Sequence, residues 1–465
     1  MNRNTAALAL LGLLAGGVHA EPDSPPETAL RDYVEAPDPT FSWHVQARYQ
    51  APGAEVVELR LHSQTWRDVL WKHQLYLIRP DDIDPGIRQG MLVIGGGRWR
   101  ESYDTNTAAE LPEEAPLFIG IAQELGTVVA VLAQVPFQPM FGLREDDLIA
   151  HTFQEFLETG DAEWPLLLPM VKSAVRAMDA VQAFTSTEWN LGIERFTVLG
   201  GSKRGWTTWL TGAVEPRAAT LVPIVIDVLN FEAHLPHQEA IWGALSQEIA
   251  PYTSRGLDDV LGTDQGGALR RIVDPYSYRR QLTQPKLVVI ATNDAYFPID
   301  SLNLYWNGLP EPKRVLYLPN DGHDIEDLAR LIPALDAMHR NGEADEPLPR
   351  LEWEFENGSD GLRVCVTGDP VPAAVSVWTA ASEDTDFREE RFSSRPAEPA
   401  EDGVFVFEDA APIGGYKAMF AEAAFGEGDA RFTLSTSVSL TGPGGGAPFP
   451  ETAAVGEEGI CPEGS

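Results

Sequence analysis

Three residues of the types that catalyse acyl transfer occur in order along the chain, each after a run of apolar residues: Ser202, Asp294 and His323. A serine hydroxyl becomes a strong nucleophile when a histidine removes its proton and an acid orients that histidine. Catalytic groups gather at the carboxyl ends of parallel strands. The three residues therefore predict a Ser-His-Asp triad for covalent acyl transfer.

The surroundings of Ser202 are typical of a nucleophile elbow, a sharp turn between a strand and a helix. An apolar run at 196–199 leads into the sequence Gly-Gly-Ser-Lys-Arg-Gly-Trp at 200–206. An arginine occupies the position of the motif's usual second glycine, and the glycine comes one residue later. A tight turn without catalytic function is the competing interpretation. A phosphate-binding loop is disfavoured, because the tryptophan stands where that loop needs a lysine.

The acid of the triad has three candidates: Asp294, its rival Asp227, and Asp300 six residues after Asp294. Asp294 lies in a turn directly after an apolar run, and His323 lies in the sequence Asn-Asp-Gly-His after the next run. Asp227 competes with Asp294, because it follows the apolar run at 221–226 and related arrangements place the acid there. The sequence leaves open whether Asp227 is the triad acid or a structural residue beneath the site.

The negative charge that develops on a carbonyl oxygen during acyl transfer is stabilised by backbone N–H donors. One donor is predicted at Lys203, directly after the nucleophile, and a second at Gly96 and Gly97 in a glycine run after an apolar segment. The side chains of Lys203 and Arg204 have two interpretations. They bind a carboxylate of the substrate, or they stabilise the junction between the strand and the helix.

Neither a metal ion nor an organic cofactor is predicted. His234 and His237 lie three residues apart, but no further ligand stands at a useful spacing. The sequence has neither the His-Glu-x-x-His pattern of zinc proteases nor the calcium loop of an EF-hand. The chemistry is therefore expected to depend on side chains and backbone groups of the chain itself.

Apolar runs that alternate with helical patterns predict the framework that positions these residues. The runs at 91–94, 127–132 and 286–291 are continuously apolar, which is typical of parallel strands with helices on both faces of the sheet. Two earlier runs, at 56–61 and 73–78, alternate more clearly and predict an antiparallel start. The expected fold class is α/β, with a mostly parallel sheet.

The composition of the rest of the chain indicates a cap insertion, a second domain and a C-terminal tail. Residues 228–284 lack a strand pattern and predict a cap over the site or, alternatively, a packed helical excursion without a gating function. After a linker, short β-like segments with Gly, Pro and Asp turns predict a small immunoglobulin-like β-sandwich at 346–440. A flexible tail is expected at 441–465. The catalytic domain accordingly spans 21–345.

Charge and the N-terminal segment indicate the compartment. Lys and Arg number 34 and Asp and Glu number 70, which gives a net charge of −36. This charge repels nucleic-acid phosphates and anionic lipids, so we expect neither nucleic-acid binding nor stable membrane insertion. Residues 1–20 contain one arginine and a short apolar stretch that ends in Val-His-Ala. This pattern predicts a signal peptide cleaved near Ala20 and a periplasmic or secreted protein.

Cys365 and Cys461 are the only cysteines of the chain. Disulfides form and persist in the oxidising compartments to which exported proteins are delivered. Two cysteines can form one bond there, which would tie down the C-terminal tail. The sequence does not show that the two residues meet.

Three segments together resemble the PhoPQ-activated pathogenicity-related proteins: the runs at 198–207, 222–230 and 292–301. The resemblance covers about residues 28–345 and implies an α/β-hydrolase fold. The motif around Ser202 is also similar to the nucleophile elbow of glucuronoyl esterases. That local similarity implies that the basic residue after the serine, here Lys203, helps to hold the oxyanion.

These observations predict an exported serine hydrolase, and among such enzymes a carboxylic-ester hydrolase. Its expected substrate is a small-molecule or glycan-linked ester. Three alternatives stay open. One is a protein that keeps the hydrolase fold for binding or signalling without turnover, and another is a serine peptidase. The third is adhesion or carbohydrate binding by the β-sandwich, with the first domain as its support.

Overall fold

The computed structural model describes residues 28–105, 111–344, 346, 348–359, 361–449 and 459–462. The predicted signal peptide at 1–20 lies outside these ranges. Within them, no helix is both long enough and apolar enough to cross a membrane.

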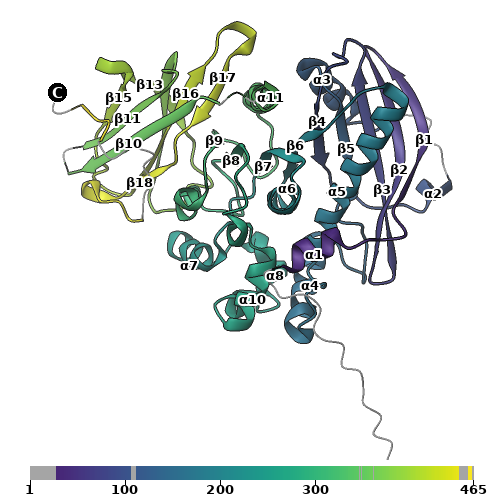
Figure 1. Cartoon of the computed structure of the whole chain (residues 1–465). Helices are drawn as coiled ribbons and strands as arrows, with labels where there is room; N and C mark the ends of the chain where they lie inside the picture. Colours follow the sequence, from purple (N-terminus) through teal and green to yellow (C-terminus); the bar gives the residue numbers. More distant parts are fainter. Residues whose placement is uncertain are drawn as a thin grey trace, which may run out of the picture.

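A large mixed sheet forms the centre of the molecule (Figure 1), and its first part has the strand order β1-β2-β3-β5-β4-β6-β7-β8-β9. Adjacent strands from β1 to β5 in this order pair antiparallel, and those from β5 to β9 pair parallel. The predicted antiparallel start and α/β-hydrolase fold are thereby confirmed. The strands are β1 (Ser42–Ala51), β2 (Ala54–Trp66), β3 (Val69–Pro80), β4 (Gln89–Ile94), β5 (Val129–Leu132), β6 (Arg195–Gly201), β7 (Ala218–Ile224), β8 (Lys286–Ala291) and β9 (Lys313–Leu318).

Helices cover the sheet. Two pairs pack together: α3 (Ala115–Leu125) with α11 (Leu328–Ala344), and α5 (Leu167–Phe184) with α6 (Lys203–Val214). Every residue of β8 and β9 is buried, so both faces of the sheet are covered there. Double coverage is the reason why β8 is apolar from Leu287 onward and β9 from Val315 onward. Shorter helices are α1 (Ala29–Glu35), which packs against α5, and α2 (Ser102–Thr105).

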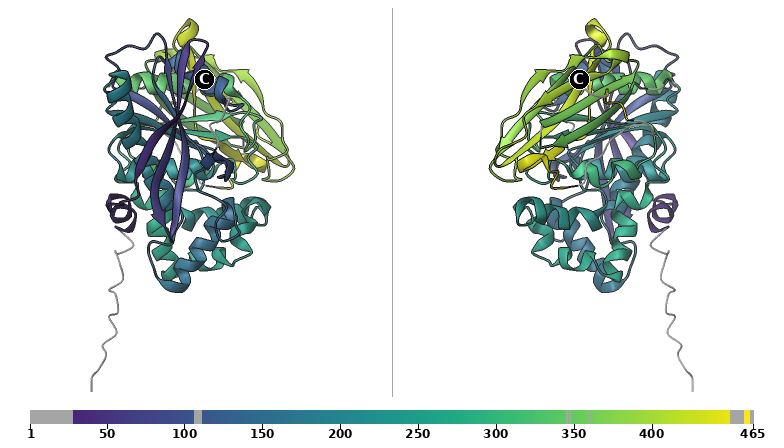
Figure 2. Two further views of the ribbon diagram at one scale, coloured as in Figure 1. Left: turned by 90° about the vertical axis from the view of Figure 1, so that its right-hand side faces the viewer. Right: turned by 90° about the vertical axis from the view of Figure 1, so that its left-hand side faces the viewer.

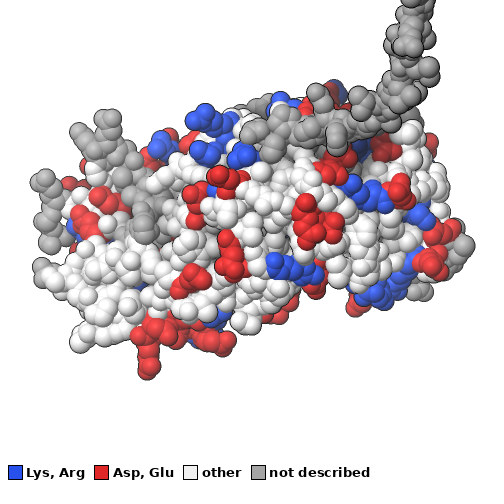
Figure 3. All heavy atoms as spheres, turned by 90° about the horizontal axis from the view of Figure 1, so that it is seen from below, with Lys and Arg blue, Asp and Glu red and all other residues white. Residues whose placement is uncertain are grey.

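The region predicted as a cap is helical. Its helices are α7 (Phe231–Trp242), α8 (Ala250–Thr253), α9 (Leu257–Leu261) and α10 (Asp264–Val273). Together with α4 (Glu145–Thr159), they lie below the sheet in Figures 1 and 2, and α8, α9 and α10 pack against α4. Acidic side chains are spread over the face seen from this side, with smaller groups of basic side chains between them (Figure 3). The cap and α4 therefore form one helical layer.

The C-terminal part of the chain contains two sheets. A separate sheet has the order β10-β11-β15-β14, whereas β17, β16, β12, β13 and β18 extend the main sheet. The extension begins where Ser435 of β17 pairs antiparallel with Val315 of β9. The bounds are β10 (Arg350–Gly358), β11 (Gly361–Asp369), β12 (Ala374–Ser382), β13 (Ser393–Pro396), β14 (Glu398–Pro399), β15 (Phe405–Asp409), β16 (Tyr416–Phe425), β17 (Phe432–Ser435) and β18 (Ser439–Thr441).

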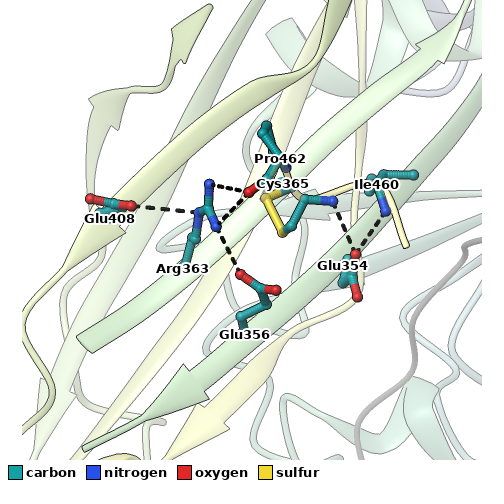
Figure 4. The surroundings of a disulfide bond; sticks show 8 residues. Glu354, Glu356, Arg363, Cys365, Glu408, Ile460 and Pro462 are labelled. Atoms are coloured by element: carbon teal, nitrogen blue, oxygen red, sulfur yellow. Dashed lines mark hydrogen bonds and ion pairs between the residues drawn. A yellow bond between two sulfur atoms is a disulfide. The ribbon is translucent and has the colours of Figure 1, made fainter. Parts of the chain in front are cut away.

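The two cysteines form a disulfide that ties residues 459–462 to the separate sheet (Figure 4). Cys365 lies on β11, and its partner is Cys461. Glu354 of β10 accepts a hydrogen bond from the N–H of Cys461 at 3.1 Å. Arg363 of β11 donates to the carbonyl oxygen of Pro462 at 3.2 Å. This part of the predicted flexible tail is therefore fixed by a covalent bond and by hydrogen bonds on both sides of it.

Candidate active site

Ser202 lies in the sharp turn between β6 and α6. Its backbone has φ 56° and ψ −129°, a conformation that residues other than glycine rarely adopt. Such strain costs about 1–3 kcal/mol and persists only where the surrounding structure enforces it. The N–H of Ser202 donates to the carbonyl oxygen of Ile224 on β7 at 2.8 Å. The turn leaves the hydroxyl at the carboxyl edge of the sheet.

Close packing explains why the second glycine of the elbow stands one residue late. A Cβ on Gly205 would lie 2.8 Å from the carbonyl oxygen of Gly200, so the helix can approach the strand only with a glycine there. Arg204 occupies the usual glycine position because its side chain leaves the junction. Its Nε donates to the carbonyl oxygen of Val135 at 2.6 Å, and its guanidinium lies against Gly96.

The structure brings Ser202, His323 and Asp294 into one hydrogen-bonded chain. The Oγ of Ser202 lies 2.9 Å from Nε2 of His323. Nδ1 of the same ring lies 2.8 Å from Oδ2 of Asp294. An ionised carboxylate only accepts hydrogen bonds, so Nδ1 carries the proton in this arrangement and Nε2 is free to accept from the serine hydroxyl. This is the protonation state that a general base needs.

The loops that carry the acid and the histidine are bonded to each other. The N–H of Asn320 donates to Oγ1 of Thr292 at 2.7 Å, and the N–H of Asn293 donates to the carbonyl oxygen of Asp321 at 2.9 Å. The Asp321 carboxylate in turn accepts from the N–H of Asp327 at 2.9 Å. These bonds fix the distance between the ends of β8 and β9.

Tyr296 contacts both Asp294 and His323, although the sequence alone did not identify it as a site residue. Its N–H donates to Oδ1 of Asp294 at 2.7 Å, so both carboxylate oxygens of Asp294 are engaged. Its ring lies over the imidazole of His323, with the ring centroids 4.1 Å apart. The only feature of the sequence that points to Tyr296 is its position two residues after Asp294. An aspartate commonly accepts a hydrogen bond from the backbone N–H two residues later in a turn, so this spacing is not specific to an active site.

Asp227, the alternative acid, has a different partner. Oδ1 accepts a hydrogen bond from the hydroxyl of Tyr305 at 2.6 Å, and within the described part of the chain Oδ2 has no hydrogen-bond partner. Burial, with a smaller contribution from the Asp294 and Asp300 carboxylates, raises the pKa of Asp227 well above its usual value. Asp227 therefore has the surroundings of a neutral, structural carboxyl group.

The side chains of Lys203 and Arg204 are paired inside the protein. Nζ of Lys203 lies 3.1 Å from Glu145 and 3.0 Å from Asp146, both at the start of α4. Arg204 lies 2.9 Å from Glu145. Although burial alone would raise it, these two cations lower the pKa of Glu145 to about 2. Two cations and two anions balance, which favours the structural interpretation of the basic pair over a site for a substrate carboxylate.

The segments that carry the predicted oxyanion donors follow neighbouring strands of the sheet. β4 and β6 are parallel neighbours, with Ile94 opposite Gly200. Gly96 comes two residues after Ile94, and Ser202 comes two residues after Gly200. The N–H groups of Gly96, Gly97 and Lys203 make no hydrogen bond among the residues that the structure describes. Free donors of this kind can bind an oxyanion.

A cavity of about 100 Å³ opens beside Ser202. The wall is mainly apolar and comes from α6, from the cap helices and from the loop after β8. Trp206, Phe231, Leu257, Leu269 and Phe297 are among the side chains that form it. The cap predicted from the sequence therefore supplies much of the wall of the cavity.

Residues 385–392 reach the site from the C-terminal part. Nδ2 of Asn293 donates to the carbonyl oxygens of Arg388 and Glu390, at 2.9 and 2.8 Å. Asn320 exchanges two hydrogen bonds with the backbone of Phe392. The loops of the acid and the histidine are thus held from outside the main catalytic region. Sequence reasoning missed this support, because no local pattern reports contacts across about a hundred residues.

His234 and His237 lie three residues apart in the cap, but among the described residues they do not form part of a metal site. His237 pairs with Asp300, with Nε2 and Oδ1 2.8 Å apart. Neither ring nitrogen of His234 has a hydrogen-bond partner among the described residues. In the described ranges no group of three or more His, Cys, Asp or Glu side chains is arranged to hold a metal ion.

Comparison with known proteins identifies the family. Residues 30–388 match the family described as PhoPQ-activated pathogenicity-related protein. A protein named autocrine proliferation repressor protein A, from Dictyostelium discoideum, is 32% identical over 441 residues and covers 86% of each chain. The chain therefore belongs to the PhoPQ-activated pathogenicity-related protein family.

Solved structures with a similar arrangement include esterases. An acetyl xylan esterase from Paenibacillus sp. R4 has a TM-score of 0.47 at 15% identity, over 69% of this chain and 92% of the other. Acetyl xylan esterase 1 from Thermoanaerobacterium sp. JW/SL YS485 has a TM-score of 0.46 at 15% identity, over 68% and 92%. A glucuronoyl esterase from Solibacter usitatus has a TM-score of 0.39 at 11% identity, over 65% and 88%.

Proposed function

We propose that this member of the family is an exported serine hydrolase that cleaves carboxylic esters. The observation that carries the proposal is the hydrogen-bonded chain from Ser202 through His323 to Asp294, on a serine held at positive φ. Strain at a residue with a nucleophilic side chain is typical of functional sites.

In the proposed first step, Oγ of Ser202 attacks the carbonyl carbon of the ester while Nε2 of His323 takes the hydroxyl proton. The imidazole becomes a cation, and the carboxylate of Asp294, 2.8 Å from Nδ1, stabilises it. The carbonyl oxygen becomes an oxyanion. It is bound by the N–H of Lys203 and by the N–H groups near Gly96 and Gly97, and each such donor is worth about 100- to 1000-fold in rate.

Collapse of the tetrahedral intermediate breaks the bond to the alcohol, which leaves with the proton from Nε2 of His323. The acyl group stays on Ser202. A water molecule then gives a proton to His323 and attacks the acyl carbon. Collapse of this second tetrahedral intermediate breaks the bond between the acyl carbon and Oγ, releases the carboxylic acid and returns the proton from His323 to Ser202. Each step uses groups of this chain.

The shape of the site favours an ester over a peptide. An extended peptide is usually bound through backbone hydrogen bonds along a groove or a strand edge. The cavity beside Ser202 is a compact, mainly apolar space that suits one small substituent. Small-molecule and glycan-linked esters are therefore the proposed substrate class. Export is supported by the disulfide and by the signal-peptide pattern at residues 1–20.

A fluorophosphonate probe tests the nucleophile. We expect it to label the mature wild-type protein and the control Ser173→Ala, which removes a buried serine hydroxyl on α5, but not Ser202→Ala. A panel of p-nitrophenyl esters and p-nitroanilides of the same acids then compares esters with amides. Absence of labelling in a folded wild-type protein would refute the hydrolase, and faster cleavage of the anilides would favour a peptidase.

A second candidate function is signalling without turnover. It is favoured by one observation, the 32% identity to a relative that is named as a proliferation repressor. Ser202→Ala separates the two functions, because it removes catalysis and preserves the surface. If a cellular response to the purified protein persists in this variant, signalling does not require the hydrolase.

A further inference from the structure

His234 is a buried polar group without a partner on the wall of the cavity beside Ser202. Its side chain belongs to α7 and is 1% exposed. It borders the same cavity as Ser202, and neither Nδ1 nor Nε2 has a hydrogen-bond partner in the described ranges. A buried donor or acceptor that is left unpaired is destabilising. An unpaired imidazole on the wall of a cavity therefore points to a group that enters the cavity.

The position of His234 relates it to the catalytic candidates. The Phe297 ring packs near both histidines: its centroid is 5.8 Å from that of His234 and 6.2 Å from that of His323. The imidazole of His234 therefore shares a neighbouring ring with the proposed general base. Ser202 and His234 border one cavity, so a group attached to Ser202 shares that space with the imidazole.

His234 offers both kinds of hydrogen bond. Burial, and to a smaller extent the neighbouring His237, lowers the pKa of His234 to about 3, so the ring is neutral at physiological pH. A neutral imidazole has one N–H donor and one acceptor nitrogen. A hydroxyl group matches this pair, because it can accept from the first and donate to the second. A carboxylate can only accept.

Other polar side chains on the wall of the cavity, unlike His234, are paired or partly exposed. Lys203 and Asp146 are paired with each other at 3.0 Å, and Asp146 also accepts from the hydroxyl of Tyr252 at 2.9 Å. Asp258 on α9 is partly exposed, although its Oδ1 has no hydrogen-bond partner in the described part of the chain. His234 is therefore the deeper of the two unpaired groups, and Asp258 provides a matched control in the same cavity.

The position of the cavity beside Ser202 suits the acyl half of the ester, which stays on the serine after the first step. In covalent acyl transfer the alcohol departs after the first step, whereas the acyl group remains on the serine until water attacks. Ser202 and Lys203 both border the cavity. An acyl chain on Ser202 Oγ can fill this space while the alcohol leaves.

We propose that the cavity binds the acyl group of the substrate and that His234 recognises a hydroxyl group on an otherwise apolar acyl chain. This proposal rests on the proposed hydrolase function. It makes His234 a specificity-determining residue, and it narrows the substrate class to esters of compact hydroxylated acids. A pocket built to bind a hydroxyl discriminates against the analogue that lacks it, because the buried partner is then left unpaired.

The experiment compares three p-nitrophenyl esters whose acyl chains have the same number of non-hydrogen atoms. One chain is purely alkyl, one ends in a methyl ether, and one ends in a hydroxyl group. We expect kcat/KM of wild type to rise in this order, with the alcohol about tenfold or more above the alkyl ester. In His234→Phe the ratio falls to about one and the alkyl ester is cleaved faster than by wild type, because the unpaired imidazole is gone. Asp258→Leu retains the wild-type ratio.

The outcomes are separable. Turnover of all three esters without preference overturns the assignment of His234 and leaves the hydrolase intact. Loss of the preference in Asp258→Leu rather than in His234→Phe also overturns it, and thermal melting checks that both variants are folded. A second series with one acyl group and varied alcohols tests the acyl assignment, which fails if hydroxyl selectivity follows the alcohol. No turnover and no fluorophosphonate labelling in wild type would refute the hydrolase and this proposal together.

Discussion

The carboxyl ends of β7 and β8 each carry a buried aspartate, and the two aspartates differ in what they contact. Asp227, after β7, is 1% exposed and accepts a hydrogen bond from the Tyr305 hydroxyl. Asp294, after β8, is 3% exposed and accepts from the N–H of Tyr296 and from the imidazole of His323. Burial is nearly equal at the two strand ends, so it cannot be what distinguishes them.

The difference lies in the charge that the partner can carry. When His323 takes a proton, a cation forms directly beside Asp294, and a negative charge there is stabilising. A phenol stays neutral at ordinary pH, so Tyr305 offers Asp227 one hydrogen bond and no cation. A buried carboxyl without a cation favours its neutral form. We therefore expect the hydrogen-bond partner, and not burial, to decide which of the two aspartates assists catalysis.

The largest expected effect is that of Asp294→Asn on activity. An asparagine at this position allows the wrong tautomer of His323 and cannot stabilise its cation, so we expect kcat/KM for p-nitrophenyl acetate to fall by about ten-thousandfold. Steady-state kinetics at neutral pH measure it, and circular dichroism controls for folding. A loss below tenfold would mean that another group orients the histidine.

The next largest effect is expected on stability, from Tyr305→Phe. This change removes the donor to Oδ1 of Asp227, whose other oxygen already lacks a hydrogen-bond partner among the described residues. We expect a loss of about 1–3 kcal/mol in the free energy of unfolding, measured with urea. The matched control is Tyr296→Phe, because that side chain lies over His323 and its hydroxyl has no contact with Asp227. Equal losses in the two variants would show that the Tyr305–Asp227 bond is not special.

The pH dependence of stability should separate the two strand ends further. The raised pKa of folded Asp227 means that the folded state holds more protons than the unfolded state above the ordinary aspartate pKa of about 3.9. Its stabilising contribution is present below that pH and is lost as the pH rises toward the folded pKa, by at most about 1.4 kcal/mol per pH unit.

The test compares urea unfolding of wild type and Asp227→Asn between about pH 4 and pH 8. Asparagine does not titrate, so the variant lacks this loss. Its stability relative to wild type should therefore improve as the pH rises. A difference that stays constant over the range would mean that Asp227 has an ordinary pKa in the folded protein.

Local patterns in the sequence were sufficient to predict the main sheet and the candidate residues of the active site. The continuous apolar runs of β8 and β9 predicted parallel strands covered on both faces, which the structure confirms. The elbow around Ser202 and the Asn-Asp-Gly-His turn identified side chains that the structure brings within hydrogen-bond distance. Their catalytic role stays a prediction. Each of these signals lies within a few residues, where chain geometry restricts what the sequence can form.

Contacts between distant segments could not be predicted. Lys203 and Arg204 had two interpretations until their partners on α4 were visible, because ion pairs depend on which helices meet. β17 pairs with β9 at one position, Ser435 opposite Val315, and this pairing joins the predicted sandwich to the main sheet. The periodicity of the sequence contains no information about it. The unpaired state of His234 is likewise a property of the folded cavity and not of its neighbours in sequence.

The smallest expected effect is that of Asp227→Asn on activity, and it is the sharpest test of the comparison. Asparagine has nearly the shape of a protonated aspartate, and its carbonyl oxygen can still accept from Tyr305. We therefore expect kcat/KM for p-nitrophenyl acetate to stay within about two- to threefold of wild type, the size of a mutation that removes no essential interaction. The same assay with Asp294→Asn provides the scale. A loss as large as that of Asp294→Asn would show that Asp227 acts on His323 during turnover, and the partner seen in the resting structure would then not be the one that matters for catalysis.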